Sequence, residues 1–163
     1  LDQNRSQWDQ LLIHRGLAAL ERAHGLNAAR GPYLLQAEIA ACHARARTPS
    51  ETDWHRIVSL YTELARLTPS PVIELNRAVA VSMAHGPQAG LALVDALASE
   101  PSLARYHLLP SVRGDLLYKL GRQSEARREF ERAAALTRNT RERGLLLARA
   151  ASCAADPTNA SGK

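Results

Sequence analysis

Proline and glycine interrupt this chain at short intervals and leave eight segments of helical length between them. The breaks fall at Gly25, Gly31-Pro32, Thr48-Pro49-Ser50, Thr68-Pro69-Ser70-Pro71, His85-Gly86-Pro87, Glu100-Pro101, Gly121 and Arg138-Asn139. Apolar residues recur between them at helical spacing, which predicts helices over 5–24, 32–47, 52–67, 71–85, 88–99, 104–120, 123–136 and 139–152. Ala and Leu, the best helix formers among apolar residues, dominate these segments, so the chain is predicted to be all-α.

Two of these helices have recognisable start signals. Ser70 precedes Pro71, which gives an N-cap followed by a proline at the first helical position. Asn139 is followed three residues later by Glu142, a spacing that resembles a capping box. These signals support the starts of the helices over 71–85 and 139–152.

Three segments share a pattern in which a small or apolar residue is followed by a bulky one at +4 and another apolar residue at +7. The three sets are Ile57, Tyr61 and Leu64 in "WHRIVSLYTELARLTP", Ala89, Leu93 and Ala96 in "QAGLALVDALASEP", and Ala126, Phe130 and Ala133 in "EARREFERAAAL". Another helix precedes each copy, and before the last copy Gly114, Leu117 and Gly121 occupy its small, large and turn positions. The pattern resembles the tetratricopeptide (TPR) repeat, a helix–turn–helix unit of about 34 residues.

The resemblance predicts a TPR-like array of helical hairpins with about three repeats. The copies are degenerate, because their first positions lie 32 and then 37 residues apart. The helices over 5–24 and 139–152 are expected to act as flanking caps, as terminal elements of such arrays do. Phe130 is predicted to lock the last helix pair against the second cap.

Length and composition place this array in one domain over residues 1–152, with residues 153–163 as a flexible tail. The chain begins at Leu1 without an initiator Met, so it is expected to be part of a longer protein. No signal peptide and no apolar run long enough to cross a membrane is recognisable, which predicts a cytoplasmic protein without a membrane partner. Cys42 and Cys153 lie among alanines without CxxC spacing and are interpreted as small buried hydrophobic residues.

The segment "GPYLLQAEIAACHARA", residues 31–46, shows how one helix of the array distributes its residues. Its apolar stripe consists of Leu35, Ile39, Cys42 and Ala46. Glu38 and Arg45 share another face, which is predicted to face solvent. A third stripe consists of Gln36, Ala40 and His43.

The TPR resemblance implies that the first helix of each pair lines a concave groove. Gln36, Asn76 and Asp115 occupy comparable places in successive first helices, so they are predicted to form a row along this groove. The residues expected near the row are His43, Arg77, Arg113 and Tyr118. In the alternative interpretation, Gln36 and Asn76 bond to neighbouring backbone inside the stack.

The net charge of +5 comes from one part of the chain. Residues 1–118 carry eleven basic and eleven acidic side chains, whereas residues 119–149 carry nine basic and four acidic ones. A basic end can attract nucleic acid or an acidic protein surface. The alternative is a solvated helix face with Glu125–Arg128 and Glu129–Arg132 pairs at helical spacing.

The sequence contains no recognisable catalytic or metal-binding pattern. Gly-rich phosphate loops and a nucleophile elbow are missing, and the six histidines form no HxxxH or HExxH spacing. No enzymatic activity, cofactor or metal is therefore expected, and the fold analogy favours protein binding.

Several strings together resemble the C-terminal extension of a group of bacterial extracytoplasmic-function (ECF) RNA polymerase sigma factors. They include "WD" at 8–9, "GPYLLQAEIAACHA" at 31–44, "TDW" at 52–54, "PSPVIELNRAVAV" at 69–81, "GPQAGLALVDAL" at 86–97 and "ARYHLLPSVRGDLLYKLGR" at 104–122. In that group a TPR-like domain follows two sigma regions that bind polymerase and promoter DNA. The resemblance runs from about Asp2 to Arg149, and Leu35 and Glu38 depart from the family's pattern.

The resemblance implies a regulatory protein-interaction domain that modulates sigma activity in transcription initiation without catalysis. The expected partners are the sigma regions of the same polypeptide, RNA polymerase, or a further regulatory protein. DNA would be contacted only through the sigma regions, which this sequence does not contain. The alternative function is a free-standing TPR adaptor that binds a peptide or protein in its concave groove.

Overall fold

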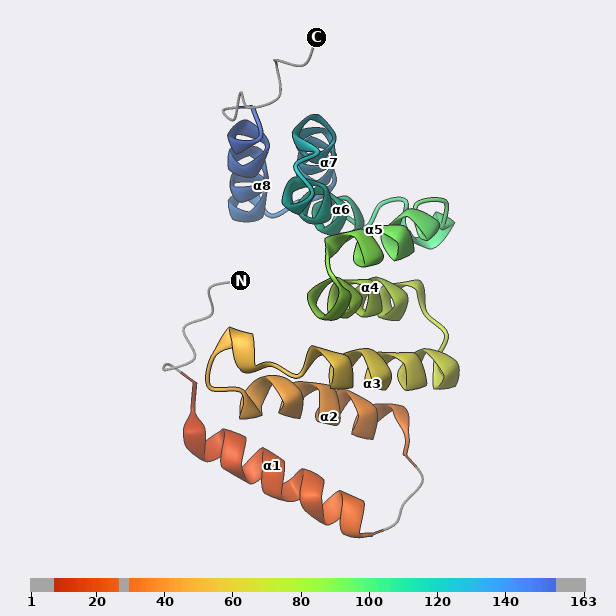
Figure 1. The fold of residues 1–163 in the computed structure, drawn as a ribbon, viewed down its shortest axis with the longest axis vertical. Coiled ribbons are helices and arrows are strands. Elements are labelled where there is room, and N and C mark those ends of the chain that lie inside the picture. Colours follow the sequence, from red (N-terminus) through yellow and green to blue (C-terminus); the bar gives the residue numbers. More distant parts are fainter. Residues whose placement is uncertain (1–7, 27–29, 155–163) are drawn as a thin grey trace. The chain divides into compact units, whose positions relative to one another are not determined.

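The computed structural model describes residues 8–26 and 30–154, and within these ranges the chain forms eight α-helices and no strand (Figure 1). The chain divides into two compact units, unit 1 (Leu1–Ala80) and unit 2 (Val81–Lys163). Unit 1 contains α1 (Gln10–Gly25), α2 (Pro32–Arg45), the short 3₁₀ helix η2 (Pro49–Glu51), α3 (Trp54–Leu67) and most of α4 (Pro71–His85). Unit 2 contains the end of α4, α5 (Pro87–Ala96), the 3₁₀ helix η3 (Pro101–Leu103), α6 (Leu108–Lys119), α7 (Gln123–Leu136) and α8 (Thr140–Ser152).

The predicted all-α fold is confirmed, and three helix ends differ from the prediction by three residues or more. α1 begins at Gln10, because the carboxylate of Asp9 caps it by accepting the N–H of Leu12 at 3.0 Å; the predicted helical residues 5–7 lie outside the described residues. α6 begins at Leu108 instead of residue 104, since η3 and a turn occupy the preceding positions. α5 ends at Ala96 instead of residue 99.

The core of unit 1 lies between α2 and α3, which run side by side in Figure 1. The predicted apolar stripe of α2 is confirmed, with Leu35 fully buried, Ile39 and Ala46 buried, and Cys42 half-buried. The stripe packs on buried side chains of α3, namely Ile57, Leu60 and Leu64. Each such side chain stabilises the fold by about 1.5–3 kcal/mol through removal from water.

Glu38 contradicts the prediction that its face of α2 is solvated: only 6% of its side chain is exposed. Two arginines and one histidine converge on its carboxylate. Nε2 of His24 lies 3.1 Å from one oxygen, while Arg30 and Arg56 bind the other oxygen at 2.6 and 2.7 Å. Arg30 also bridges to Glu63 of α3 at 2.8 Å. One carboxylate on α2 therefore joins α1, the segment before α2, and α3, and the position of Glu38 on its own helix does not reveal this.

Burial and ion pairing act on the Glu38 carboxylate in opposite directions. Burial alone would raise its pKa, since it disfavours the charged form. The hydrogen bonds from Arg30 and His24 and the charges of Arg30 and Arg56 outweigh burial, and the pKa of Glu38 lies below its ordinary value. Glu38 is accordingly ionised at neutral pH and stabilises unit 1 as an anion.

Unit 2 is built around Phe130 of α7. The predicted repeat positions Ala126, Phe130 and Ala133 are all fully buried, and both α6 and α8 pack against α7. Gly114 of α6 faces the Phe130 ring so closely that a Cβ atom there would lie 2.7 Å from its Cε1. On the α8 side, the guanidinium carbon of Arg149 stacks 4.4 Å from the ring centroid. Phe130 thus contacts both neighbouring helices, as predicted for the residue that locks the last pair to the cap.

The predicted repeat position in α5 is one residue out of register. The structure buries Gly90, Leu91 and Val94, whereas Leu93 is half-buried and Ala96 is exposed. The small-to-bulky spacing of four therefore belongs to Gly90 and Val94. The helix follows Gly86, whose φ of +92° reverses the chain in a conformation that favours glycine.

α8 ends at Ser152, and the single domain over residues 1–152 stays a prediction. Cys153 caps the helix and remains buried, and Cys42 is half-buried, so both free thiols pack as small apolar groups. Burial raises the pKa of both thiols. Of the predicted flexible tail, residues 155–163 lie outside the described residues.

Candidate functional site

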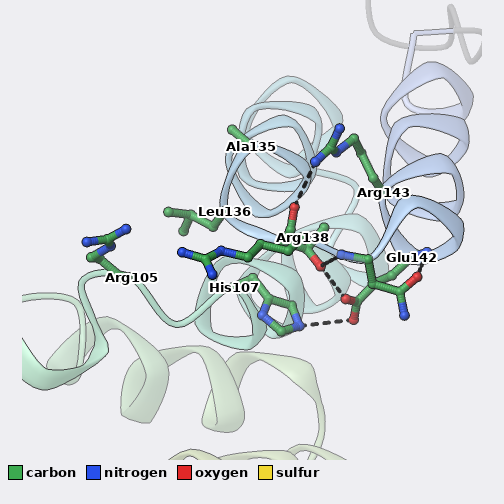
Figure 2. A pocket seen from close by; sticks show the side chains of 9 residues that line it. Arg105, His107, Ala135, Leu136, Arg138, Glu142 and Arg143 are labelled. Carbon is green, nitrogen blue, oxygen red and sulfur yellow. Dashed lines mark hydrogen bonds and ion pairs between the residues drawn. The ribbon is translucent and has the colours of Figure 1, made fainter.

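A hollow of about 720 Å³ lies in unit 2, where the start of α6, the end of α7 and the start of α8 meet (Figure 2). We call it the basic hollow, because three arginines line it. Its charged and polar lining residues include Arg105, His107, Arg138, Glu142 and Arg143, and Ala135 and Leu136 add an apolar side.

The turn between α7 and α8 forms one wall of the basic hollow. The side-chain oxygen of Asn139 caps α8 by accepting the N–H of Arg141 at 3.0 Å and of Glu142 at 3.2 Å. The predicted capping box is confirmed in this half only. The N–H of Asn139 donates to the hydroxyl of Thr137 at 3.2 Å, and this hydroxyl donates to Glu142 at 2.5 Å. Thr137 therefore takes the place that the carboxylate holds in a standard capping box.

Glu142 links this turn to α6. Nε2 of His107, the residue before α6, lies 3.0 Å from its second carboxylate oxygen (Figure 2). The hydrogen bond from Thr137 holds the pKa of Glu142 below its ordinary value; partial burial opposes the shift and His107 reinforces it. The one carboxylate in the lining is thus ionised and already occupied by protein groups.

The arginines of the basic hollow differ in their contacts. Arg143 donates to the backbone oxygen of Thr137 at 3.1 Å, which fixes its guanidinium at the wall. Arg105 and Arg138 are exposed, and Arg138 extends from the α7–α8 turn toward Arg105 in Figure 2. Among the described residues, neither of these two forms an ion pair. The hollow therefore offers two uncommitted guanidinium groups on one side.

Two arginines at the start and in the middle of α7 are paired with glutamates. Arg122 binds Glu125 at 2.7 Å, and Arg127 binds Glu131 at 2.8 Å. The predicted Glu125–Arg128 pair is wrong, because Arg122 at the start of α7 takes that carboxylate. The predicted Glu129–Arg132 pair is present at a long 3.8 Å. Glutamates thus break up the positive charge along α7.

The predicted groove residues of unit 1 have different environments. Gln36 on α2 and Asn76 on α4 are exposed. His43 is half-buried, with its ring edge-on to Trp54 at a centroid distance of 5.3 Å. Arg77 forms an ion pair at 2.7 Å with Glu74 on the same helix.

The predicted groove residues of unit 2 all lie on α6 but point to different neighbours. Arg113 binds Asp95 of α5 at 2.8 Å and Glu129 of α7 at 2.9 Å. Burial opposes its charge, yet these partners raise the pKa of Arg113. Asp115 pairs with Arg149 of α8, and Tyr118 lines a small cavity of about 170 Å³ beside Arg149. The predicted row from Gln36 through Asn76 to Asp115 spans both units and stays a prediction.

The basic hollow itself was absent from the sequence interpretation. The sequence places Arg138 at a break between helices and among the nine basic residues of 119–149, and Arg105 in the helix expected over 104–120. The available signal was the placement of both arginines at helix breaks flanking α6 and α8. A hairpin array brings such breaks together at the ends of its helices.

No group of three or more His, Cys, Asp or Glu side chains within residues 8–26 and 30–154 is placed to hold a metal ion. No helix within the same residues has both the length and the apolar character that crossing a membrane requires.

No family model matches this chain. An uncharacterized protein of Rhizobium meliloti (strain 1021) is 46% identical over 156 residues, which cover 96% of this chain and 36% of that protein. The chain therefore spans about a third of the length of this relative.

Two solved structures share the fold. The first TPR domain of human RPAP3 matches with a TM-score of 0.59 and 20% identity, over 80% of this chain and all of that chain. The first TPR of Spaghetti (RPAP3), bound to the HSP90 peptide SRMEEVD, matches with a TM-score of 0.58 and 19% identity, over 77% of this chain and 94% of that one. The chain thus has a TPR-like fold.

Proposed function

We propose that this chain is a protein-interaction domain that binds a segment of a partner protein. The observation that carries the proposal is the TPR-like fold, which a solved neighbour uses to hold a peptide. TPR-like domains are typically protein-interaction modules without catalytic activity, so the proposal is an analogy from the fold. The exposed Gln36 and Asn76 of unit 1 and the uncommitted arginines of unit 2 provide polar groups for such a segment.

Selection from a phage-displayed random peptide library, followed by calorimetry with the free peptides, tests this function. We expect the enriched peptides to bind with a Kd of about 1 μM, which corresponds to a binding free energy of about −8 kcal/mol. A matched selection against the thermally unfolded chain controls for peptides that recognise exposed apolar segments. If no peptide binds the folded chain better than the unfolded one, the interaction function is wrong.

We infer as a more specific function that the domain regulates an ECF sigma factor. The resemblance of "PSPVIELNRAVAV" and "RYHLLP" to the sigma-factor extension supports this, and so does the relative that extends well beyond the matched region. The segment bound would then belong to the sigma regions or to RNA polymerase. A free-standing adaptor is the alternative, which the peptide-bound TPR neighbour favours.

The coding sequence upstream of Leu1 separates these two functions. About 170 residues of sigma-like sequence there, on the scale of a domain or two, would support the regulatory function. In vitro transcription would then compare the full-length sigma factor with a version that lacks residues 1–152. Loss of transcription from the cognate promoter is expected, and a truncated protein as active as the full-length one would contradict regulation.

DNA binding by the domain alone should be weak, independent of sequence and lost as salt rises. Promoter readout needs an element that enters a groove and presents side chains to base edges. Here Glu125, Glu129 and Glu131 lie between the basic residues of α7. They form ion pairs with Arg122, Arg113 and Arg127, respectively. A salt-resistant, sequence-specific gel shift with the isolated domain would contradict this.

A further inference from the structure

We propose that the basic hollow of unit 2 binds carboxylate side chains of an acidic segment in a partner protein. The assignment rests on the proposed interaction function for the nature of its ligand, and it adds the chemistry of that ligand and the place where it binds. The hollow lies at the ends of α6, α7 and α8, and none of the predicted groove residues lines it.

The charges that line the hollow favour an anionic ligand. Three arginines line it, and the one glutamate in the lining, Glu142, is held by Thr137 and His107. Arg138 points toward Arg105 without an intervening carboxylate (Figure 2). Two like charges that face one opening repel each other, and a bound anion would relieve this repulsion. Elsewhere in unit 2, Arg113, Arg122 and Arg127 each bind a carboxylate of the chain itself.

The geometry of the hollow suits carboxylate groups. Guanidinium groups bind carboxylates through paired N–H donors, so one acidic side chain can engage one arginine with two hydrogen bonds. The wall that carries Arg138 is fixed, because Asn139 caps α8 and Thr137 bonds to Glu142. Arg143 is likewise anchored to the carbonyl of Thr137. Because the wall formed by the α7–α8 turn is already fixed, binding needs to order only the exposed side chains of Arg105 and Arg138.

The lining favours a peptide over a nucleic acid. Leu136 and Ala135 give the hollow an apolar side, against which the methylene groups of a glutamate can pack. A nucleic acid is instead held by a track of cations that follows its backbone. Along α7 such a track is interrupted, because Glu125 and Glu131 neutralise Arg122 and Arg127.

Calorimetry with a capped hexaglutamate peptide tests the hollow on the complete chain. We expect measurable binding at about 0.15 M ionic strength, where the Debye length of about 8 Å suppresses remote charges. The double variant Arg105→Gln/Arg138→Gln should weaken this binding about tenfold or more. Both side chains are exposed and form no ion pair within residues 8–26 and 30–154, so the variant should fold normally, which circular dichroism would verify.

The matched control is Arg66→Gln/Arg128→Gln, which removes the same charge from exposed positions outside the hollow. It should reduce affinity less than about threefold, since only the long-range field changes. Equal losses in the two double variants would overturn the proposal, because binding would then follow net charge alone. Absence of hexaglutamate binding would overturn it as well.

Two further probes define the ligand. The capped hexaglutamine peptide should not bind, and a single-stranded oligonucleotide should bind both double variants equally. If loss of Arg105 and Arg138 weakens oligonucleotide binding more than hexaglutamate binding, the choice of a protein partner is overturned. If phage selection yields peptides whose binding ignores both arginines, the interaction function stands and the acidic ligand is wrong. If selection yields none while hexaglutamate depends on the hollow, the carboxylate site stands without the proposed function.

Discussion

Gly114 of α6 leaves no room for a side chain against Phe130 of α7, because a Cβ atom would lie 2.7 and 2.8 Å from two ring carbons. The ring is fully buried, and the guanidinium of Arg149 lies 4.4 Å from its centroid on the α8 side. The ring therefore cannot shift without disturbing α8. The contact fixes how closely α6 and α7 approach.

Gly114→Ala should lower the free energy of unfolding by about 1–3 kcal/mol, the typical cost of overpacking a filled core. Gly144→Ala on α8 is the matched control, since no atom lies within 4 Å of the new Cβ. That control should stabilise the protein by about 0.5–1 kcal/mol, because alanine favours the helix. Urea denaturation of both variants measures the difference in sign, and equal effects would show that α6 and α7 are not in close contact.

Phe130→Ala should cost about 3–5 kcal/mol, because it removes the largest fully buried side chain and leaves a cavity between three helices. The same denaturation experiment measures this cost. Combining Phe130→Leu with Gly114→Ala should destabilise less than the sum of the two single changes, since the smaller side chain makes room for the new methyl group. Strict additivity would place the two residues out of contact.

The protein should lose more stability when the arginine partners of Glu38 are replaced than when Glu38 itself is replaced. Glu38→Gln leaves Arg30 and Arg56 free to contact water, because 38% and 48% of their side chains are exposed, and should cost about 1–3 kcal/mol. Arg30→Met/Arg56→Met leaves a carboxylate that is only 6% exposed and should cost about 3–5 kcal/mol. Thermal unfolding measures the order, and a larger loss for Glu38→Gln would contradict the buried carboxylate.

The stability of unit 1 should fall in acid through Glu38. Its pKa is lower in the folded chain than the ordinary value of about 4.3, so its stabilising contribution is complete above that value. The contribution is lost as pH falls from about 5 through the folded pKa, because the unfolded chain binds the proton first. Glu38→Gln should flatten the dependence of the free energy of unfolding on pH below about 5.

Glu21→Gln is the control for the pH series. Glu21 is exposed on α1 and forms no ion pair among the described residues. Its replacement should leave the pH dependence of the parent unchanged. Parallel curves for the parent and Glu38→Gln would show that Arg30, Arg56 and His24 do not hold the carboxylate.

The predicted groove can be tested by replacing Gln36, Asn76 and Asp115 with alanine together. The first two side chains are exposed, and the ion pair of Asp115 with Arg149 is partly exposed and worth about 0–1 kcal/mol. The triple variant should therefore unfold close to the parent and lose affinity for peptides obtained by phage selection. Unchanged peptide affinity would move the binding site away from the groove, and a loss of several kcal/mol would favour the structural role.

Helix positions and the packing of α7 could be predicted from the sequence because both depend on local signals. Proline and glycine mark the breaks, and Ala126, Phe130 and Ala133 repeat at a spacing that one helix face requires. The register of α5 was less predictable. That helix is rich in small apolar residues on more than one face, so adjacent registers have similar patterns.

The environment of Glu38 could not be predicted from α2 alone. Its three partners come from α1, from the segment before α2 and from α3, and only the packing of these elements brings them together. The basic hollow has the same origin, since Arg105 and Arg138 lie on different turns. Local sequence patterns determine helices, whereas such clusters depend on which helix ends meet.

The contact of His24 with Glu38 has a consequence for how unit 1 opens. Leu20 is the one buried residue among the described positions of α1, so this helix adheres to α2 through little apolar area and a partly exposed polar contact. The core between α2 and α3 does not include α1. Dissolved ions compete for the polar contact and leave the core intact, so rising salt should separate α1 from α2 before this core opens. The face of α2 that α1 covers would then be exposed while the core between α2 and α3 is still folded.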